Sequence, residues 1–155
     1  MVSANQTDFG GPNQAKYNYC IDFSYDGELL EGLWHGQGTL QHTFPDGTNY
    51  GLRSAVYEGS FERGRMNGQG KMIWKDREGS IIKSYEGGLI NDKPSGWGVK
   101  IVTGKLKLEG EWLNGMLHGK FTKTFLDQAR VERCTYHKGK LESFLDITFP
   151  SGSRF

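Results

Sequence analysis

The stretch Tyr57-Glu58-Gly59-Ser60-Phe61-Glu62-Arg63-Gly64-Arg65-Met66-Asn67-Gly68-Gln69-Gly70 decides the fold of this chain. It fits a frame of fourteen positions with an aromatic or large apolar residue at positions 1 and 5 and glycine at positions 3, 8, 12 and 14. The same frame begins again at residues 25, 85 and 108. Self-similarity of this kind is the sequence signature of a repeat architecture.

Glycine is the most regular feature of the four units. Asp92 replaces it at position 8 of the third unit and Phe121 replaces it at position 14 of the fourth. We predict turn or trough roles for the remaining glycines of the frame, which are Gly27, Gly32, Gly36, Gly38, Gly59, Gly64, Gly68, Gly70, Gly87, Gly96, Gly98, Gly110, Gly115 and Gly119. A degenerate fifth unit follows near residue 132, with Tyr136 at position 5 and Gly139 at position 8.

The frame predicts a β-hairpin. Positions 1, 3 and 5 share one face of an extended strand, and positions 2 and 4 share the other, polar face. Glycine at position 8 can adopt the positive φ of a tight turn, as at Arg63-Gly64 and Asn114-Gly115. On the returning strand, positions 12 and 14 are expected to share a face and to leave a trough for the rings of positions 1 and 5. Rings over glycine then take the place of a globular core.

Hairpins must stack, because a single hairpin is only marginally stable in water. Further turns are predicted at Pro45-Asp46-Gly47, at 75–79 and at 103–105. The predicted fold is all-β: an elongated, curved, single-layer antiparallel sheet of stacked β-hairpins without helix in the array. The predicted boundaries are an N-terminal extension over 1–22, an array over 23–152 and a tail over 153–155. The end of the array, 148–152, echoes 43–47 of the first unit.

Two departures from the frame predict irregularities. Asp92-Lys93-Pro94 is expected to break the turn of the third unit. The insertion from Thr48 to Val56 is expected to form a bulging loop between the first two units.

Composition narrows the classes of function. Lys and Arg number 19 against 18 Asp and Glu, without a long run of either sign, which argues against a nucleic-acid partner. The two cysteines are too few for a disulfide framework and favour a reducing compartment. The first twenty residues have no secretory pattern, so we expect a cytoplasmic protein.

Three arrangements that could suggest chemistry have simpler explanations. Residues 115–120 resemble a phosphate-binding loop but lack the hydroxyl residue after Lys120, and their glycines belong to the repeat. Cys134 and His137 would point to opposite faces of a strand, so they make a poor nucleophile and base. The histidines are scattered. We therefore predict no enzymatic activity, no catalytic residue, no metal site and no cofactor.

The aromatic residues form the candidate binding site. In a single-layer sheet one side of each ring is expected to stay open, and a contiguous apolar strip of that kind typically marks a partner site. The predicted groove residues are Tyr25, Tyr57, Phe61, Trp74, Tyr85, Trp112 and Tyr136. Trp97 points to the opposite face, where an exposed ring would indicate a second contact.

The segment Tyr57 to Gly70 resembles the MORN repeat, the membrane occupation and recognition nexus. The resemblance implies an open curved sheet that binds a peptide or helix of other protein subunits in the aromatic groove, with frequent self-association. It also implies an adaptor in a cytoskeletal assembly of the ciliary, axonemal or flagellar kind, similar to radial-spoke components. The alternative is a peripheral membrane tether for acidic phospholipid, with the candidate lysines Lys100, Lys105, Lys107, Lys120 and Lys123.

Overall fold

The computed structural model describes residues 22–45 and 51–149. The N-terminal extension up to residue 21, the turn residues Asp46-Gly47, the first part of the predicted loop, residues 150–152 and the tail lie outside the described residues. Within the described ranges no helix is long and apolar enough to cross a membrane.

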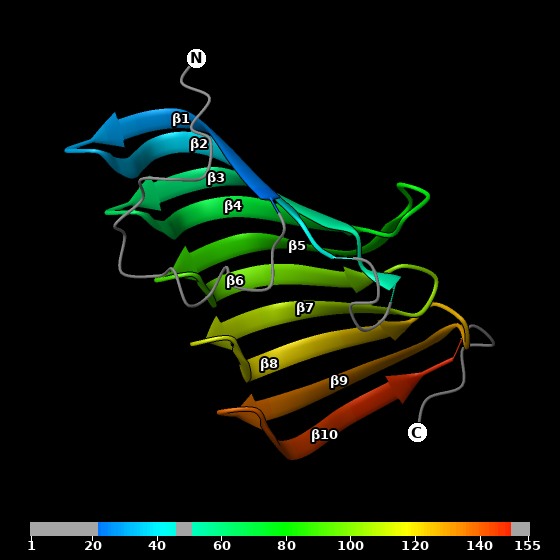
Figure 1. The fold of residues 1–155 in the computed structure, drawn as a ribbon. Coiled ribbons are helices and arrows are strands. Elements are labelled where there is room, and N and C mark those ends of the chain that lie inside the picture. Colours follow the sequence, from blue (N-terminus) through cyan, green and yellow to red (C-terminus); the bar gives the residue numbers. More distant parts are fainter. Residues whose placement is uncertain (1–21, 46–50, 150–155) are drawn as a thin grey trace.

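The described chain forms one open antiparallel sheet in which each strand pairs only with its neighbours in sequence (Figure 1). This arrangement confirms the predicted class of a single-layer sheet of stacked hairpins. The strands run from β1 at one end to β10 at the other, and β9 and β10 form a fifth hairpin. Their bounds are β1 Asp22–Leu30, β2 Leu33–Thr43, β3 Ser54–Glu62, β4 Arg65–Lys75, β5 Ile81–Ile90, β6 Lys93–Val102, β7 Leu106–Leu113, β8 Met116–Phe125, β9 Arg130–His137 and β10 Lys140–Thr148.

All five hairpins turn in the same way. Both residues of each turn have positive φ, which is the geometry that matches the twist of paired strands. Gly64 has a φ of 77°, as its place at position 8 predicts. The turn pairs are Glu31-Gly32, Arg63-Gly64, Asn91-Asp92, Asn114-Gly115 and Lys138-Gly139.

The third turn corrects the prediction that Asp92-Lys93-Pro94 would break the frame. Asp92 adopts a φ of 68°, close to the values of the glycines it replaces. Aspartate tolerates this left-handed conformation better than most residues. Its carboxylate also accepts a hydrogen bond from the backbone N–H of Met66 at 3.0 Å, which ties the turn to the preceding hairpin.

The turns also lock neighbouring hairpins in register. The N–H of Gly64 donates to the carbonyl of Trp34 at 2.9 Å, from position 8 of one unit to position 10 of the unit before it. The same bond recurs from Asp92 to Met66 at 2.9 Å. It recurs again from Gly115 to Pro94 and from Gly139 to Leu117, both at 2.8 Å. Position 8 therefore requires a residue that adopts the left-handed conformation and has a backbone N–H to donate. Aspartate meets both requirements and can replace glycine there.

A row of glycines crosses the middle of the sheet. Position 14 of one strand and position 3 of the next are direct partners, so the row continues from hairpin to hairpin through Gly27, Gly38, Gly59, Gly70, Gly87, Gly98 and Gly110. A Cβ on Gly70 would lie 2.3 Å from the ring of Tyr57. The tyrosine at position 1 therefore needs glycine at positions 3 and 14 of its own hairpin.

Position 12 differs from the prediction. Gly68 has a φ of 104°, and a Cβ there would lie 2.9 Å from Ser60 on the polar face rather than under a ring. The register shifts nearby, between Gly59 and Phe61, which marks a bulge. Positions 12 and 14 thus do not form one trough, because the bulged strand needs a left-handed residue at position 12.

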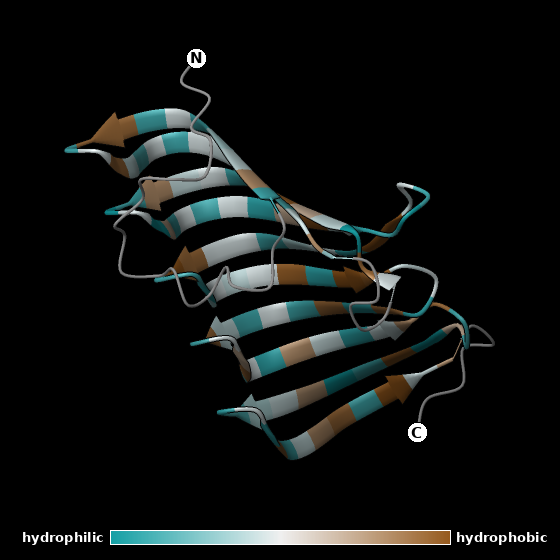
Figure 2. Cartoon of the chain, viewed as in Figure 1, coloured by the Kyte–Doolittle hydropathy of each residue, from teal (hydrophilic) through white to brown (hydrophobic). Residues whose placement is uncertain are grey.

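The connections between hairpins are partly as predicted. The turns at 75–79 and 103–105 are present, with Gly79 at a φ of 83° and Gly104 at 70°. The predicted loop from Thr48 to Val56 is wrong over its last residues, because Ser54–Val56 already belong to β3 and pair with both β2 and β4. Hydropathy alone marks the core weakly, since the middle of the strands is pale in Figure 2 and the strongest hydrophobic colour lies near strand ends.

Candidate functional site

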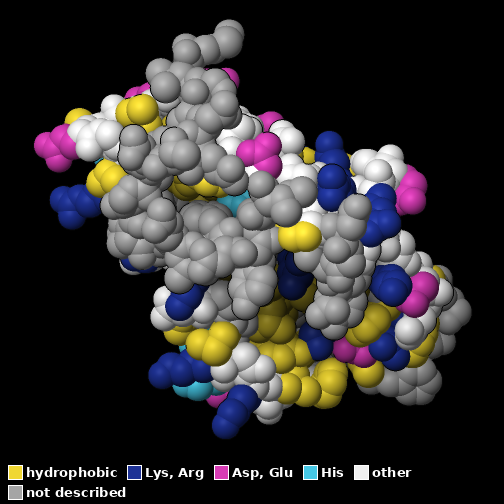
Figure 3. All heavy atoms as spheres, viewed as in Figure 1, with side chains coloured by type: hydrophobic (Ala, Val, Ile, Leu, Met, Phe, Trp, Pro, Cys, Tyr) yellow, Lys and Arg dark blue, Asp and Glu magenta, His cyan; other side chains and the backbone are white. Residues whose placement is uncertain are grey.

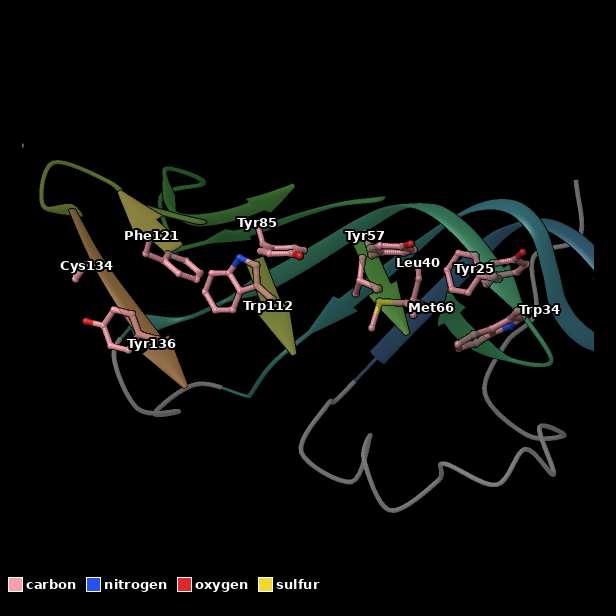
Figure 4. Close-up of a cluster of buried hydrophobic side chains, with 12 residues drawn as sticks. Tyr25, Trp34, Leu40, Tyr57, Met66, Tyr85, Trp112, Phe121, Cys134 and Tyr136 are labelled. Carbon is pink, nitrogen blue, oxygen red and sulfur yellow. The ribbon is translucent and has the colours of Figure 1, made fainter. Parts of the chain in front are cut away.

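The aromatic residues of the frame lie in one row on one side of the sheet, which we call the ring face (Figure 4). Their side chains are almost completely buried, with Tyr57 at 0% and Phe61 at 3% exposure. The buried cluster consists of Tyr25, Trp34, Leu40, Tyr57, Phe61, Met66, Tyr85, Leu89, Trp112, Phe121, Cys134 and Tyr136. Six of the seven predicted groove residues belong to it, and Trp74 packs against it half-buried.

The predicted open side of each ring is not observed, because neighbouring rings close it. Phe61 stands edge-on to Tyr57 and to Tyr25, with ring centroids 5.1 Å apart in both pairs. Trp112 likewise meets the edges of Tyr85 and Phe121. Edge-to-face pairs of this kind stabilise each other by about 0.5–1.5 kcal/mol beyond the area they bury. The rings are first of all the core of the sheet.

The tyrosine hydroxyls at position 1 complete the backbone hydrogen bonding. Tyr57 donates to the carbonyl of Ser60 at 3.1 Å and Tyr85 donates to the carbonyl of Gly88 at 2.8 Å, in each case from position 1 to position 4. The bulges leave these carbonyls beside a register shift, and the hydroxyl supplies a donor. Burial raises the pKa of Tyr57 to about 12, with the charge of Asp92 adding to the rise, and burial raises the pKa of Tyr85 to about 12.

In the fourth unit the aromatic ring that covers the central glycine comes from position 14 instead of position 1. Leu108 stands where the other units have tyrosine, and Phe121 stands where they have glycine. A Cβ on Gly110 would lie 2.8 Å from the Phe121 ring, so that ring covers the glycine from the opposite strand. The indole N–H of Trp112 donates to the carbonyl of Gly98 at 3.2 Å. The two departures in the sequence therefore compensate each other.

Trp34 is a core residue that the repeat frame does not predict. It stacks on Tyr25 with centroids 5.1 Å apart and meets the edge of Phe61. The signal was present, because position 10 pairs across the turn with position 5 and so shares its face. Leu29, at position 5 of the first unit, remains 44% exposed.

Five partly buried hydrophobic residues border the buried cluster on the ring face: Phe23, Met72, Trp74, Leu108 and Leu117. We call them the apolar border. The ammonium group of Lys83 also makes a cation–π contact with Trp74, at 4.0 Å from the centroid of its ring. On the face seen in Figure 3, hydrophobic side chains are visible over the half of the sheet that holds β7 to β10.

The five lysines considered for lipid binding do not form one strip. Lys100 and Lys123 pair with Leu108 and lie on the ring face. Lys107 and Lys120 lie on the opposite face, and Lys105 lies in a turn. The alternation of strand side chains separates them.

No side-chain arrangement in the described chain suggests a catalytic or metal site. Cys134 is fully buried, and His137 is exposed on the opposite face. The rings of His118 and His137 lie 5.2 Å apart, with the His118 Nδ1 accepting the N–H of Lys138. Within residues 22–45 and 51–149, no three residues of His, Cys, Asp or Glu gather as metal ligands.

Comparison with known proteins relates three of the five hairpins to a known repeat family. The family model of the MORN repeat matches residues 25–48, 57–78 and 109–120, which belong to the first, second and fourth hairpins. Over 82 residues the chain is 36% identical to MORN repeat-containing protein 3 of Xenopus laevis. That alignment covers 52% of this chain and 31% of the relative, so the chain matches about a third of the length of that protein.

Proposed function

Since this chain is a MORN-repeat protein, we propose that it is a non-enzymatic scaffold that holds a segment of another protein along the ring face. The observation that carries the proposal is the apolar border, a set of half-buried side chains on a sheet that has no second layer within the described residues. Apolar side chains left beside a packed core typically mark an interaction surface.

The residues of the apolar border pack against the buried rings. Met72 pairs with Tyr57 and with Tyr85, and Leu108 follows in the same row of the sheet after Lys100. A partner helix or extended peptide lying across these strands would contact the apolar border first and the edges of the rings second. A stacked sheet keeps such contacts at fixed spacing, because each hairpin is held by its neighbours.

The proposed setting is a larger cytoskeletal assembly in the cytoplasm, of the ciliary or flagellar kind. This part of the proposal comes from the resemblance of the repeat to those of radial-spoke components. Immunofluorescence of the tagged full chain tests it directly, with co-localisation on microtubule structures as the expected result and a diffuse signal as the contrary one.

Purification of proteins that bind the full chain, followed by affinity measurements on variants, tests the binding surface. Trp74→Ala should weaken binding of a recovered partner by roughly tenfold, as the loss of an interface anchor does, with little change in melting temperature. Ile81→Ala is the matched control, because Ile81 is 46% exposed and lies outside the apolar border. Equal affinities of both variants would place the partner elsewhere.

Phe61→Ala and Trp112→Ala separate packing from binding. Both rings are buried, so the structure predicts a loss of stability of about 3–5 kcal/mol for each. A tenfold loss of partner affinity without loss of stability would instead make them direct anchors.

Binding of acidic lipid is the second candidate. Lys83 lies on the ring face with Lys100, and burial followed by the charge of Lys100 lowers the pKa of Lys83. Two neighbouring ammonium groups would favour an anion there. Co-sedimentation with phosphatidylserine vesicles at physiological salt, lost in Lys83→Gln, would support this candidate over the protein scaffold.

A further inference from the structure

Trp97 is the most exposed large hydrophobic residue in the described part of the chain, at 62%. It lies in β6 on the face opposite the rings and pairs with Glu111. Within the described residues its ring packs against no other aromatic ring and its indole makes no hydrogen bond. The fold therefore does not need this tryptophan, although an exposed indole opposes solubility.

A hollow of about 880 Å³ lies beside Trp97 on this face. Its floor includes the backbone of Gly59, Gly70 and Gly87. Trp97, Val99 and Ile101 occupy every second position of β6, so their side chains share one face and line one side of the hollow. Register shifts between β3 and β4 and between β5 and β6 accompany the glycine floor, and such bulges bend strands. The volume lies within the range of protein binding pockets, which is roughly 300–1,000 Å³.

The charges around the hollow favour a cation. Its two lysines are already paired: Lys71 with Glu86 at 3.5 Å, and Lys107 with Glu109 at 2.9 Å. Glu58 lines the hollow and has no ion pair or hydrogen bond within the described chain. Glu111, across the strand from Trp97, is also unpaired there. Glu111 thus offers a free carboxylate beside the open indole ring, and Glu58 offers another on the far side of the hollow, on β3, three strands from Trp97.

We propose that an arginine-rich segment of a partner protein lies across this hollow, with one guanidinium stacked on Trp97 beside the carboxylate of Glu111 and a second arginine paired with Glu58 on the far side. Arginine suits the site better than lysine, because its planar, weakly hydrated group stacks on aromatic faces and hydrogen-bonds carboxylates with two N–H groups. The aliphatic part of the segment would lie on Val99 and Ile101. This site is independent of the ring face, so the sheet can hold two partners at once.

The test is a titration of the full ¹⁵N-labelled chain with a short peptide of alternating arginine and glycine, followed through the tryptophan indole signals. The Trp97 signal, assigned by its absence from Trp97→Ala, should shift saturably while those of Trp34 and Trp112 stay in place. A glutamine–glycine peptide should have no effect, and a lysine–glycine peptide should bind more weakly. Trp97→Ala should weaken arginine-peptide binding roughly tenfold, near the upper range of a cation–π contact.

Matched variants separate the site from general electrostatics. Glu58→Gln should weaken binding by several-fold, whereas Glu142→Gln, on the edge strand β10, should not. Phe144→Ala removes a ring that is 55% exposed outside the hollow and should bind like the unmodified chain. Equal binding by Trp97→Ala and the unmodified chain, or equal shifts of all indole signals, would overturn the proposal. So would self-association of the chain that Trp97→Ala abolishes, because the occupant would then be a second copy.

Discussion

Gly70 provides the most direct test of the packing between rings and glycines. Its backbone is not in the left-handed region, so substitution by alanine adds a methyl group without backbone strain. That methyl carbon would lie 2.3 Å from the ring of Tyr57, whereas two carbon atoms prefer about 3.5–4.0 Å. Gly70→Ala must therefore displace the ring by more than an ångström.

The ring has little freedom to move. Tyr57 is 0% exposed, and its hydroxyl donates a hydrogen bond to the carbonyl of Ser60. The Phe61 ring packs against it in a T-shaped pair with the ring centroids 5.1 Å apart. Overpacking of a core costs about 1–3 kcal/mol, and loss of the hydroxyl bond adds about 1 kcal/mol. We expect Gly70→Ala to lower the free energy of unfolding by about 2–4 kcal/mol, or the melting temperature by roughly 10 °C.

A double-mutant cycle isolates the cause. Tyr57→Leu puts at position 1 the residue that the fourth unit has there naturally, and it removes the ring. In that background Gly70→Ala should be neutral or stabilise by about 0.4–1 kcal/mol, as alanine for glycine does where it fits. Urea unfolding of the four proteins gives the coupling energy, which should be at least about 2 kcal/mol. An equal cost of Gly70→Ala in both backgrounds would refute the reasoning.

Three further predictions concern the turns and the phenols. Gly64→Val should destabilise by more than the roughly 1 kcal/mol of an average substitution, because valine resists a φ of 77°; an unchanged melting temperature would contradict the turn assignment. Asp92→Ala should cost about 1–3 kcal/mol in urea unfolding, since it leaves the Met66 N–H without its acceptor, and Asp92→Gly should cost less because it retains the left-handed turn. The pKa of Tyr57 and of Tyr85 is about 12 in the folded state and about 10 in the unfolded state, so their contribution to the free energy of unfolding is complete below pH 10 and is lost as the pH rises from 10 to 12. Tyr57→Phe should therefore make the free energy of unfolding fall less steeply over this pH range, and an unchanged slope would argue against a buried phenol.

The repeat frame predicted most of the fold. Glycine at position 8 predicted the hairpin turns, and the shared parity of positions 1, 3 and 5 predicted which residues meet on one face. What the frame could not show was the bulge, because a glycine required for its φ looks the same in sequence as a glycine required for space. Gly68 and Gly70 are two residues apart and serve these two different needs.

Asp92 shows a related limit. Aspartate in place of glycine looks like a broken turn in the sequence, because only the structure shows that its carboxylate accepts the backbone N–H of Met66 in the preceding hairpin. The exchange of Leu108 and Phe121 is similar. Each departure looks like decay of the repeat on its own, and only the pairing of Phe121 with Gly110 shows that the ring has moved to the opposite strand.

The candidate site was predicted less well than the fold, for a physical reason. A single-layer sheet has no second layer to bury its apolar side chains, so its rings must cover one another. The residues that are easiest to recognise in the repeat are therefore committed to stability, and their exposed area is small. In the proposed scaffold, binding specificity therefore comes from residues that the frame leaves free, such as Trp74 beside the rings and Trp97 on the other face. Neither tryptophan is required by the frame, whereas position 1 is constrained by the need to cover glycine and position 5 by its packing against the neighbouring rings. A change at Trp97 can thus alter partner choice without altering the sheet, and the same change at Phe61 cannot.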